Sequence, residues 1–175
     1  MTRITSTASA LLPVMGVFLV LYVSLTAGGT LDYALLSPER WLQSPWVEPG
    51  AEIATATRIV YAAVWLLPVA AGVVAVLSAV ELLSLVRRGV LFDQRIARRF
   101  RIAGIGCAAS GALDLLANLV TPTILSWHNP SGAFAPSFYF NSEAAGLILC
   151  GGGFYLTGWI MAEAIRLKDE NEGFV

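Results

Sequence analysis

The chain has 175 residues, of which 57% are hydrophobic and 13% are charged, and its formal net charge at pH 7 is -1. A soluble domain is about half apolar and roughly a quarter charged, so this composition indicates an integral membrane protein. Four apolar stretches fill the chain and leave no room for a separate soluble domain. We therefore predict an all-α, four-helix membrane bundle that forms a single transmembrane domain over residues 1–175.

The first predicted span covers about residues 10–27 and follows a Thr5-Ser6-Thr7 cluster whose hydroxyls can cap a helix. A short basic start before an apolar run is also typical of a signal peptide, with residues 25–29 as a small-residue cleavage site. We expect the helix to be retained, because its apolar run is long for a signal peptide. Its removal would also leave three spans, with the two termini on opposite sides of the membrane.

The segment from Gly28 to Thr57 is predicted to be an extracytoplasmic loop, because it carries three prolines and two tryptophans. Tryptophan gathers at membrane interfaces, so Trp41 and Trp46 are interpreted as interface anchors. The pairs Leu35-Leu36 and Trp41-Leu42 suggest a short amphipathic piece that lies on the outer membrane surface. A loop that caps a ligand site is the alternative.

A basic hinge follows the second predicted span, which covers about residues 59–86 and should stop at Gly89. Six of the eleven Lys and Arg residues lie in this hinge: Arg87, Arg88, Arg95, Arg98, Arg99 and Arg101. Asp93 is a plausible N-cap for the next helix, whose first turns are basic and whose span covers about residues 102–125. We expect the hinge arginines to contact lipid headgroups or a docked protein.

The distribution of basic residues predicts the orientation of the chain. Arg3, the six hinge arginines, Arg166 and Lys168 fall on one side of the predicted spans, and Arg40 and Arg58 fall on the other, which is nine against two. Basic residues that flank spans stay in the cytoplasm. Both termini are therefore predicted to be cytoplasmic, in a multi-pass protein of a bacterial inner membrane.

The second outer loop is predicted between Thr121 and Asn141, with a run of aromatics from Phe134 to Phe140. Its Phe138-Tyr139-Phe140 segment could be extended or could lie on the interface. Asn141 or Ser142 should cap the fourth span, at about residues 144–165. The chain then continues from Arg166 as a charged tail.

Asp114 is the most informative polar residue, because an acid within a span costs several kcal/mol unless it is paired, protonated or in contact with water. It should face the bundle interior with Asn118 one turn away and a hydroxyl from Tyr22, Tyr155 or Thr157 at similar depth. We interpret Asp114 and Asn118 as an inter-helix hydrogen-bond clamp, with a proton or ligand site as the alternative.

Small residues on the third and fourth spans should let these helices approach closely. They share one predicted face on each helix: Ala103, Cys107 and Gly111 on the third, and Gly146, Cys150, Gly153 and Thr157 on the fourth.

Three further acids lie near the predicted span ends. Glu81 and Glu163 should form ion pairs, Glu81 with Arg88, Arg98 or Arg101 and Glu163 with Arg166. Glu143 should sit at the outer start of the fourth helix, where its charge suits the helix dipole. The tail acids Asp169, Glu170 and Glu172 should flank the hinge arginines.

Several enzyme classes lack their required residues, so we expect no enzymatic activity, no cofactor and no metal. The single histidine, His128, falls in an outer loop, where it cannot ligate a haem within the membrane. No H-E-x-x-H cluster or nucleotide-binding glycine loop is present. Cys107 and Cys150 should differ in depth by more than ~10 Å on antiparallel helices, too far for a disulfide.

The hinge sequence Arg88-Gly89-Val90-Leu91-Phe92-Asp93 and the charged ending from Ala164 to Val175 resemble the bacterial domain-of-unknown-function 2975 family. Its members look like four-span proteins with a basic-glycine-x-x-Phe hinge and a Leu-x-x-Glu-Asn-type tail. Family genes often lie beside a gene for a small helix-turn-helix regulator, so the resemblance implies a membrane partner for a transcription factor. The long first outer loop with its tryptophans departs from the usual family pattern.

We therefore predict a non-enzymatic regulatory or sensory membrane protein with a cytoplasmic docking surface for a protein partner such as a transcriptional regulator. The alternative is a small oligomeric transporter or channel that uses Asp114 in its path. The expected partners are the lipid bilayer, a cytoplasmic protein and further copies of the chain, with no direct contact to nucleic acid.

Overall fold

The computed structural model describes residues 2–90, 92–132 and 140–172, and every long element in these ranges is a helix. The helices are α1 (Thr2–Leu31), α2 (Thr55–Arg87), α3 (Gln94–Ser126) and α4 (Ser142–Glu172). All four are long and apolar enough to cross a membrane. The predicted all-α bundle of four membrane helices is therefore confirmed.

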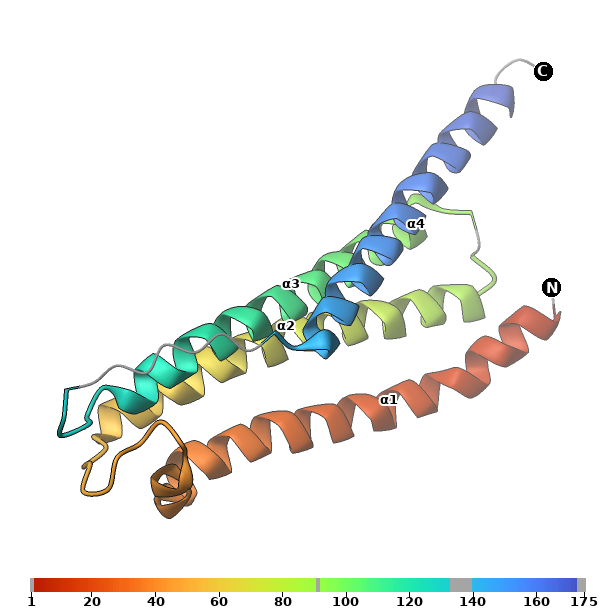
Figure 1. Ribbon diagram of the computed structural model, residues 1–175. Helices are drawn as coiled ribbons and strands as arrows, with labels where there is room; N and C mark the ends of the chain where they lie inside the picture. Colours follow the sequence, from red (N-terminus) through yellow and green to blue (C-terminus); the bar gives the residue numbers. More distant parts are fainter. Residues whose placement is uncertain (1, 91, 133–139, 173–175) are drawn as a thin grey trace.

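Consecutive helices pack against one another, α1 on α2, α2 on α3 and α3 on α4. Figure 1 shows the start of α1 and the end of α4 at the end of the bundle where α2 connects to α3. We call this the hinge end. The opposite end, which carries the connection between α1 and α2, is called the loop end.

The helices start and stop where the sequence supplies the caps. The Asp93 carboxylate accepts a 2.7 Å hydrogen bond from the backbone N–H of Arg95, and the Asn141 side chain accepts one of 2.8 Å from Glu143. Gly89, at φ +77°, follows the end of α2. These predicted boundaries are confirmed. Helix α3 continues through Thr121 and Pro122 to Ser126, close to the predicted end of the span at about residue 125, since membrane helices tolerate proline. The predicted start of the second outer loop at Thr121 is therefore too early.

Glycines bring α3 close to both of its neighbours. A Cβ at Gly106 would lie 2.8 Å from Ala75 N in α2, and a Cβ at Gly104 would lie 2.5 Å from Tyr155 N in α4. The prediction that small residues allow close approach is confirmed at Gly111, but the predicted face of α4 is wrong. Gly146 and Gly153 have nothing near their Cβ positions, whereas Gly151 and Gly158 contact α3. They are seven residues apart, two turns of one helix face.

The fourth helix is displaced along α3 toward the hinge end. Its first turn, at Ala144, lies beside Gly111, while Gly158 lies beside Ala97 and Arg101. The 15 residues of α3 after Gly111, 112–126, therefore extend beyond the start of α4 (126 − 111 = 15). Glu143 lies in the first turn of α4 and is exposed, so its predicted position at the start of this helix is confirmed. The displacement brings this first turn beside the middle of α3.

The displacement also corrects the prediction for the two cysteines. Gly151, which follows Cys150, lies against Gly104 and Ala108, on either side of Cys107. Cys107 and Cys150 are thus at a similar level, and the predicted difference in depth is wrong because it assumed helices in register. Both are free thiols.

The connection between α1 and α2 folds into a packed cap. It contains a π-helix (Asp32–Leu36) and a 3-10 helix (Pro38–Gln43). Trp41 is fully buried, donates a 2.8 Å hydrogen bond to the Tyr33 carbonyl and lies edge-on to Tyr61. The interpretation of Trp41 as an interface anchor is therefore wrong, because the aromatic rings at the ends of α1 and α2 bury it.

Hydrogen bonds join this cap to the residues after α3. Asn129 accepts a bond from Glu48 N and donates one to the Trp46 carbonyl, while the Glu48 carboxylate accepts from Ser131. His128 shares a 2.8 Å hydrogen bond with the Thr57 hydroxyl. The expectation for Phe138-Tyr139-Phe140 lies outside the described residues, apart from Phe140, which is exposed. Leu91 and the last three tail residues also lie outside them.

Candidate functional site

Asp114 lines a polar cavity of about 330 Å³ to which all four helices contribute. The lining residues are Tyr22, Thr26 and Thr30 from α1, Trp65, Pro68 and Val69 from α2, Ser110 and Asp114 from α3, and Asn141, Glu143, Ala144 and Leu147 from the start of α4. The displacement of α4 creates this site, because it brings the polar N-terminus of α4 beside the middle of α3.

The Asp114 carboxylate accepts hydrogen bonds from two side-chain amides. Asn118 donates a 3.2 Å hydrogen bond to Asp114 Oδ2 from one turn away on the same helix, and Asn141 donates another 3.2 Å bond to the same oxygen. Asn118 also donates to the Asp114 carbonyl, at 2.9 Å. The structure thus brings Asp114 and Asn118 together, while the bond that crosses from α3 to α4 comes from Asn141.

Glu143 places a second carboxylate on the cavity, close enough to Asp114 for the two charges to interact. None of the described residues that line the cavity is an arginine, lysine or histidine. Two acidic groups at this level of an apolar bundle are unfavourable unless a positive charge or water compensates them. The site is therefore electrostatically negative.

Hydroxyl groups complete the lining. Thr30 donates to the Thr26 carbonyl and Ser110 donates to the Pro68 carbonyl, both at 2.8 Å. Tyr22 and Ser110 line the cavity together. Since the Thr30 and Ser110 protons are engaged by carbonyls, their oxygens are left as hydrogen-bond acceptors. Of the three hydroxyls predicted near Asp114, Tyr22 lies there, whereas Tyr155 packs beside Gly104, nearer the hinge end.

A second cavity lies at the hinge end and is basic. It has a volume of about 340 Å³ and is lined by Glu81, Ser84, Leu85, Arg95, Arg98 and Arg99. Glu81 forms its ion pair with Arg99, not with Arg88, Arg98 or Arg101 as predicted, because α2 and α3 pack with Glu81 level with Arg99. Arg95 pairs with Asp93 at 3.5 Å. The Glu81–Arg99 and Asp93–Arg95 pairs are both partly exposed to solvent, so each contributes little to stability.

The other hinge arginines lie outside this cavity. Arg87 and Arg88 are exposed at the end of α2, and the Arg101 side chain lies against Gly158. The predicted pair of Glu163 with Arg166 is confirmed. Glu170 also pairs with Arg166, at 3.7 Å. This tail acid therefore compensates a basic residue of its own helix and does not flank the hinge arginines.

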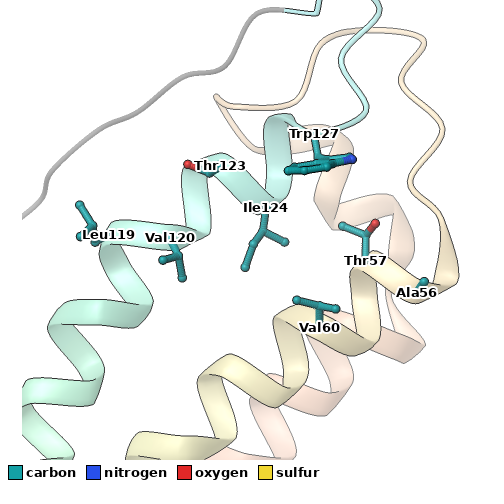
Figure 2. A pocket seen from close by; sticks show the side chains of 8 residues that line it. All are labelled: Ala56, Thr57, Val60, Leu119, Val120, Thr123, Ile124 and Trp127. Atoms are coloured by element: carbon teal, nitrogen blue, oxygen red, sulfur yellow. The ribbon is translucent and has the colours of Figure 1, made fainter.

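A third cavity, of about 560 Å³, lies between α2 and α3 near the loop end. Figure 2 shows Val60 of α2 facing Ile124 of α3, with Trp127 above them. Most of its lining is apolar: Ala56, Thr57, Val60, Leu119, Val120, Thr123, Ile124 and Trp127. It lies on the part of α3 that extends beyond α4, and its chemistry suits lipid acyl chains more than a polar ligand.

Sequence reasoning missed Thr26, Thr30, Asn141 and Glu143 as cavity residues. The spacing of Tyr22, Thr26 and Thr30 offered a signal, since residues four apart share one helix face and three hydroxyls on a face of an apolar helix are notable. Asn141 and Glu143 offered none, because only the displacement of α4 brings them to Asp114.

The sequence of the chain matches one protein-family model. The model of the family described as Protein of unknown function (DUF2975) matches residues 6–173, nearly the whole chain. No curated protein and no solved structure matches it.

Proposed function

The chain belongs to the DUF2975 family of proteins of unknown function, and from this premise we propose that it is a non-enzymatic regulatory or sensory membrane protein with a cytoplasmic docking surface. The partner it would recruit is a cytoplasmic protein such as a transcriptional regulator. The proposed location is the bacterial inner membrane, with both termini in the cytoplasm, because nine basic residues lie toward the hinge end of the chain and two toward the loop end.

The observation that carries this proposal is the length of α4. Gly158 already lies beside Ala97 near the start of α3, and α4 continues for 14 more residues to Glu172 (172 − 158 = 14). Residues 166–171, which we call the α4 arm, are all exposed and carry both signs of charge. Membrane insertion does not require such a charged helix, whereas recognition of a charged protein surface does.

The basic cavity supports the same role. Arg95, Arg98 and Arg99 line one cavity, where Asp93 pairs with Arg95 and Glu81 pairs with Arg99. Phosphate groups of lipids or carboxylates of a docked protein would compensate the remaining charge. The α4 arm and this cavity both lie toward the hinge end, so a single partner can contact both.

Deletion of residues 167–175 tests the docking role. The full chain and the truncated chain would be expressed with the same N-terminal tag, cross-linked in intact cells and purified from membranes. We expect a DNA-binding regulator to be recovered with the full chain and lost with the truncated chain. A triple variant, Lys168→Glu, Asp169→Lys and Glu170→Lys, reverses the charge at three positions of the α4 arm with residues that are compatible with a helix. This variant should also fail to recover the regulator.

Membrane insertion serves as the control for both variants, since all four spans remain. Equal recovery of the same regulator with the full and truncated chains would contradict the docking function, and recovery of no regulator with the full chain would contradict it as well.

A second candidate function, a small oligomeric transporter or channel, is favoured by the polar lining at Asp114. A transport path needs several polar groups within the membrane, and four helices supply them here. Reconstituted protein with a radioactive or fluorescent substrate would separate the candidates, since a transporter moves the substrate across vesicles and a sensor only binds it.

A further inference from the structure

We infer that the Asp114 cavity is a binding site for a small protonated organic amine. This goes beyond the docking function, because the cavity would bind its ligand whether or not the α4 arm recruits a partner. The inference rests on three properties of the cavity: its charge, its hydrogen-bond acceptors and aromatic rings, and its volume.

The charge of the cavity calls for a cation. Asp114 and Glu143 bring two carboxylates to one site, and no basic residue lies among the described residues that line it. The amides of Asn118 and Asn141 solvate Asp114, but they carry no charge. The N-terminus of α4 contributes the equivalent of about +0.5 charge, which leaves most of the negative charge uncompensated. A bound cation would compensate it.

The other lining groups favour an ammonium ion. An ammonium group donates hydrogen bonds and accepts none, and the cavity offers acceptors: the two carboxylates and the hydroxyl oxygens of Thr30 and Ser110. The rings of Tyr22 and Trp65 border the same space, and aromatic faces attract cations. A 3.0 Å hydrogen bond from Trp65 to Thr121 fixes the indole.

The volume separates an organic amine from an inorganic cation. The cavity measures about 330 Å³, at the lower end of the range for small-molecule sites, roughly 300–1,000 Å³. Pro68, Val69, Ala144 and Leu147 provide an apolar wall for a hydrocarbon group. Residues of α1 and of the start of α4 line the same cavity, whereas the described parts of these two helices are not packed on each other as consecutive helices are.

The test uses the full chain in lipid nanodiscs and isothermal titration calorimetry with benzylammonium chloride. Benzyl alcohol, which has the same ring and no charge, is the matched control ligand, and sodium chloride tests an inorganic cation. We expect benzylammonium to bind and benzyl alcohol to bind at least about tenfold more weakly, since hydrogen bonds between charged groups are the strong ones.

Two variants locate the site. Asp114→Asn and Glu143→Gln should each weaken benzylammonium binding by about tenfold or more, because each removes a charged acceptor and keeps the shape of the side chain. Glu52→Gln is the control, since Glu52 is an exposed acid in the cap and should leave binding unchanged. Should Asp114→Asn fail to fold, Glu143→Gln decides, because this exposed residue begins α4 and makes no described contact in the packed interface with α3.

Equal binding of benzyl alcohol and benzylammonium would overturn the inference in favour of a merely apolar cavity. Displacement by sodium with no binding of benzylammonium would replace the amine with an inorganic cation. Binding that survives in both carboxylate variants, or no binding of benzylammonium to the wild-type chain, would also overturn it. None of these results affects the test of the docking function, which measures whether a regulator is recovered with the full chain and with the truncated chain.

Discussion

At the scale of single residues, position in the tertiary structure decides what an aromatic or acidic side chain does. Trp41 and Leu42 are neighbours in the 3-10 helix, yet Trp41 is fully buried and Leu42 is 58% exposed. Glu143 and Glu48 are both acids of predicted outer segments, yet Glu143 lines the Asp114 cavity and Glu48 accepts hydrogen bonds from Ser131. Hydrophobicity alone does not distinguish Trp41 from Leu42, and residue type does not distinguish Glu143 from Glu48.

Substitution of Trp41 by alanine should destabilise the cap. Trp41 packs against Tyr33 and Tyr61 with ring centroids 5.6 and 5.0 Å away, and its indole N–H is hydrogen-bonded. Removal of a buried aromatic side chain typically costs about 3–5 kcal/mol. Leu42→Ala should change the free energy of unfolding by less than about 0.5 kcal/mol, because its side chain is exposed.

Thermal unfolding of the two variants in the same detergent checks this pair. Similar melting temperatures for Trp41→Ala and the wild type would contradict the assignment of Trp41 to a packed core.

At the scale of elements, the register between α3 and α4 is the main determinant of the site. Backbone contacts at Gly104 and Gly151 set it, since each Cβ position is occupied by backbone atoms of the other helix. Close approach through small residues is a common way for membrane helices to associate. Because of this register, Asn141 reaches Asp114 and the α4 arm extends past the start of α3.

Substitution of Gly151 by alanine should separate α3 from α4. The new Cβ would lie 2.5 Å from Ala108 N and 2.6 Å from Gly104 O, and backbone atoms cannot move aside as a flexible side chain can. Overpacking of this kind typically costs about 1–3 kcal/mol. Gly152→Ala is the matched control, because nothing lies within 4 Å of its Cβ position and alanine favours a helix.

Melting temperatures in detergent should therefore fall for Gly151→Ala and stay level or rise for Gly152→Ala. The opposite order would show that α3 and α4 do not pack through Gly151.

At the scale of the whole molecule, the helices form a bundle that is packed in chain order and polarised along its length. The loop end carries the cap, which is hydrogen-bonded to Asn129, while the hinge end carries the hinge arginines and the α4 arm. Figure 1 shows this arrangement, with α4 leaving the other helices toward the C-terminus. Such a molecule has a distinct surface at each end.

The orientation in the membrane can be tested with single cysteines in a chain whose Cys107 and Cys150 are replaced by serine. Glu52→Cys, in the cap, and Arg88→Cys, in the hinge, are both exposed. A membrane-impermeant maleimide should label Glu52→Cys in intact cells and Arg88→Cys only after the cells are opened, since basic hinges stay in the cytoplasm. Labelling of Arg88→Cys in intact cells would contradict the proposed topology.

The sequence by itself determined the class of the protein, its four helices and the helix ends at Gly89, Asp93 and Asn141. Hydrophobic length and capping residues such as Asp93, Gly89 and Asn141 act locally, so they can be identified from neighbouring residues alone. It also identified Asp114 and Asn118 as a polar pair, because an acid in an apolar span is unusual wherever the helix packs.

Only the tertiary structure decided which residues surround Asp114. The shift of α4 along α3 depends on backbone contacts between residues about 45 positions apart, such as Gly104 and Gly151, and no local pattern encodes it. This shift brought Asn141 and Glu143 to the Asp114 cavity and Cys150 level with Cys107, while the burial of Trp41 depended on the packing of α1 beside α2. Helix propensity and apolar length fix each helix along its own axis, but interhelical packing fixes how far one helix slides past the next, and the site lies between them.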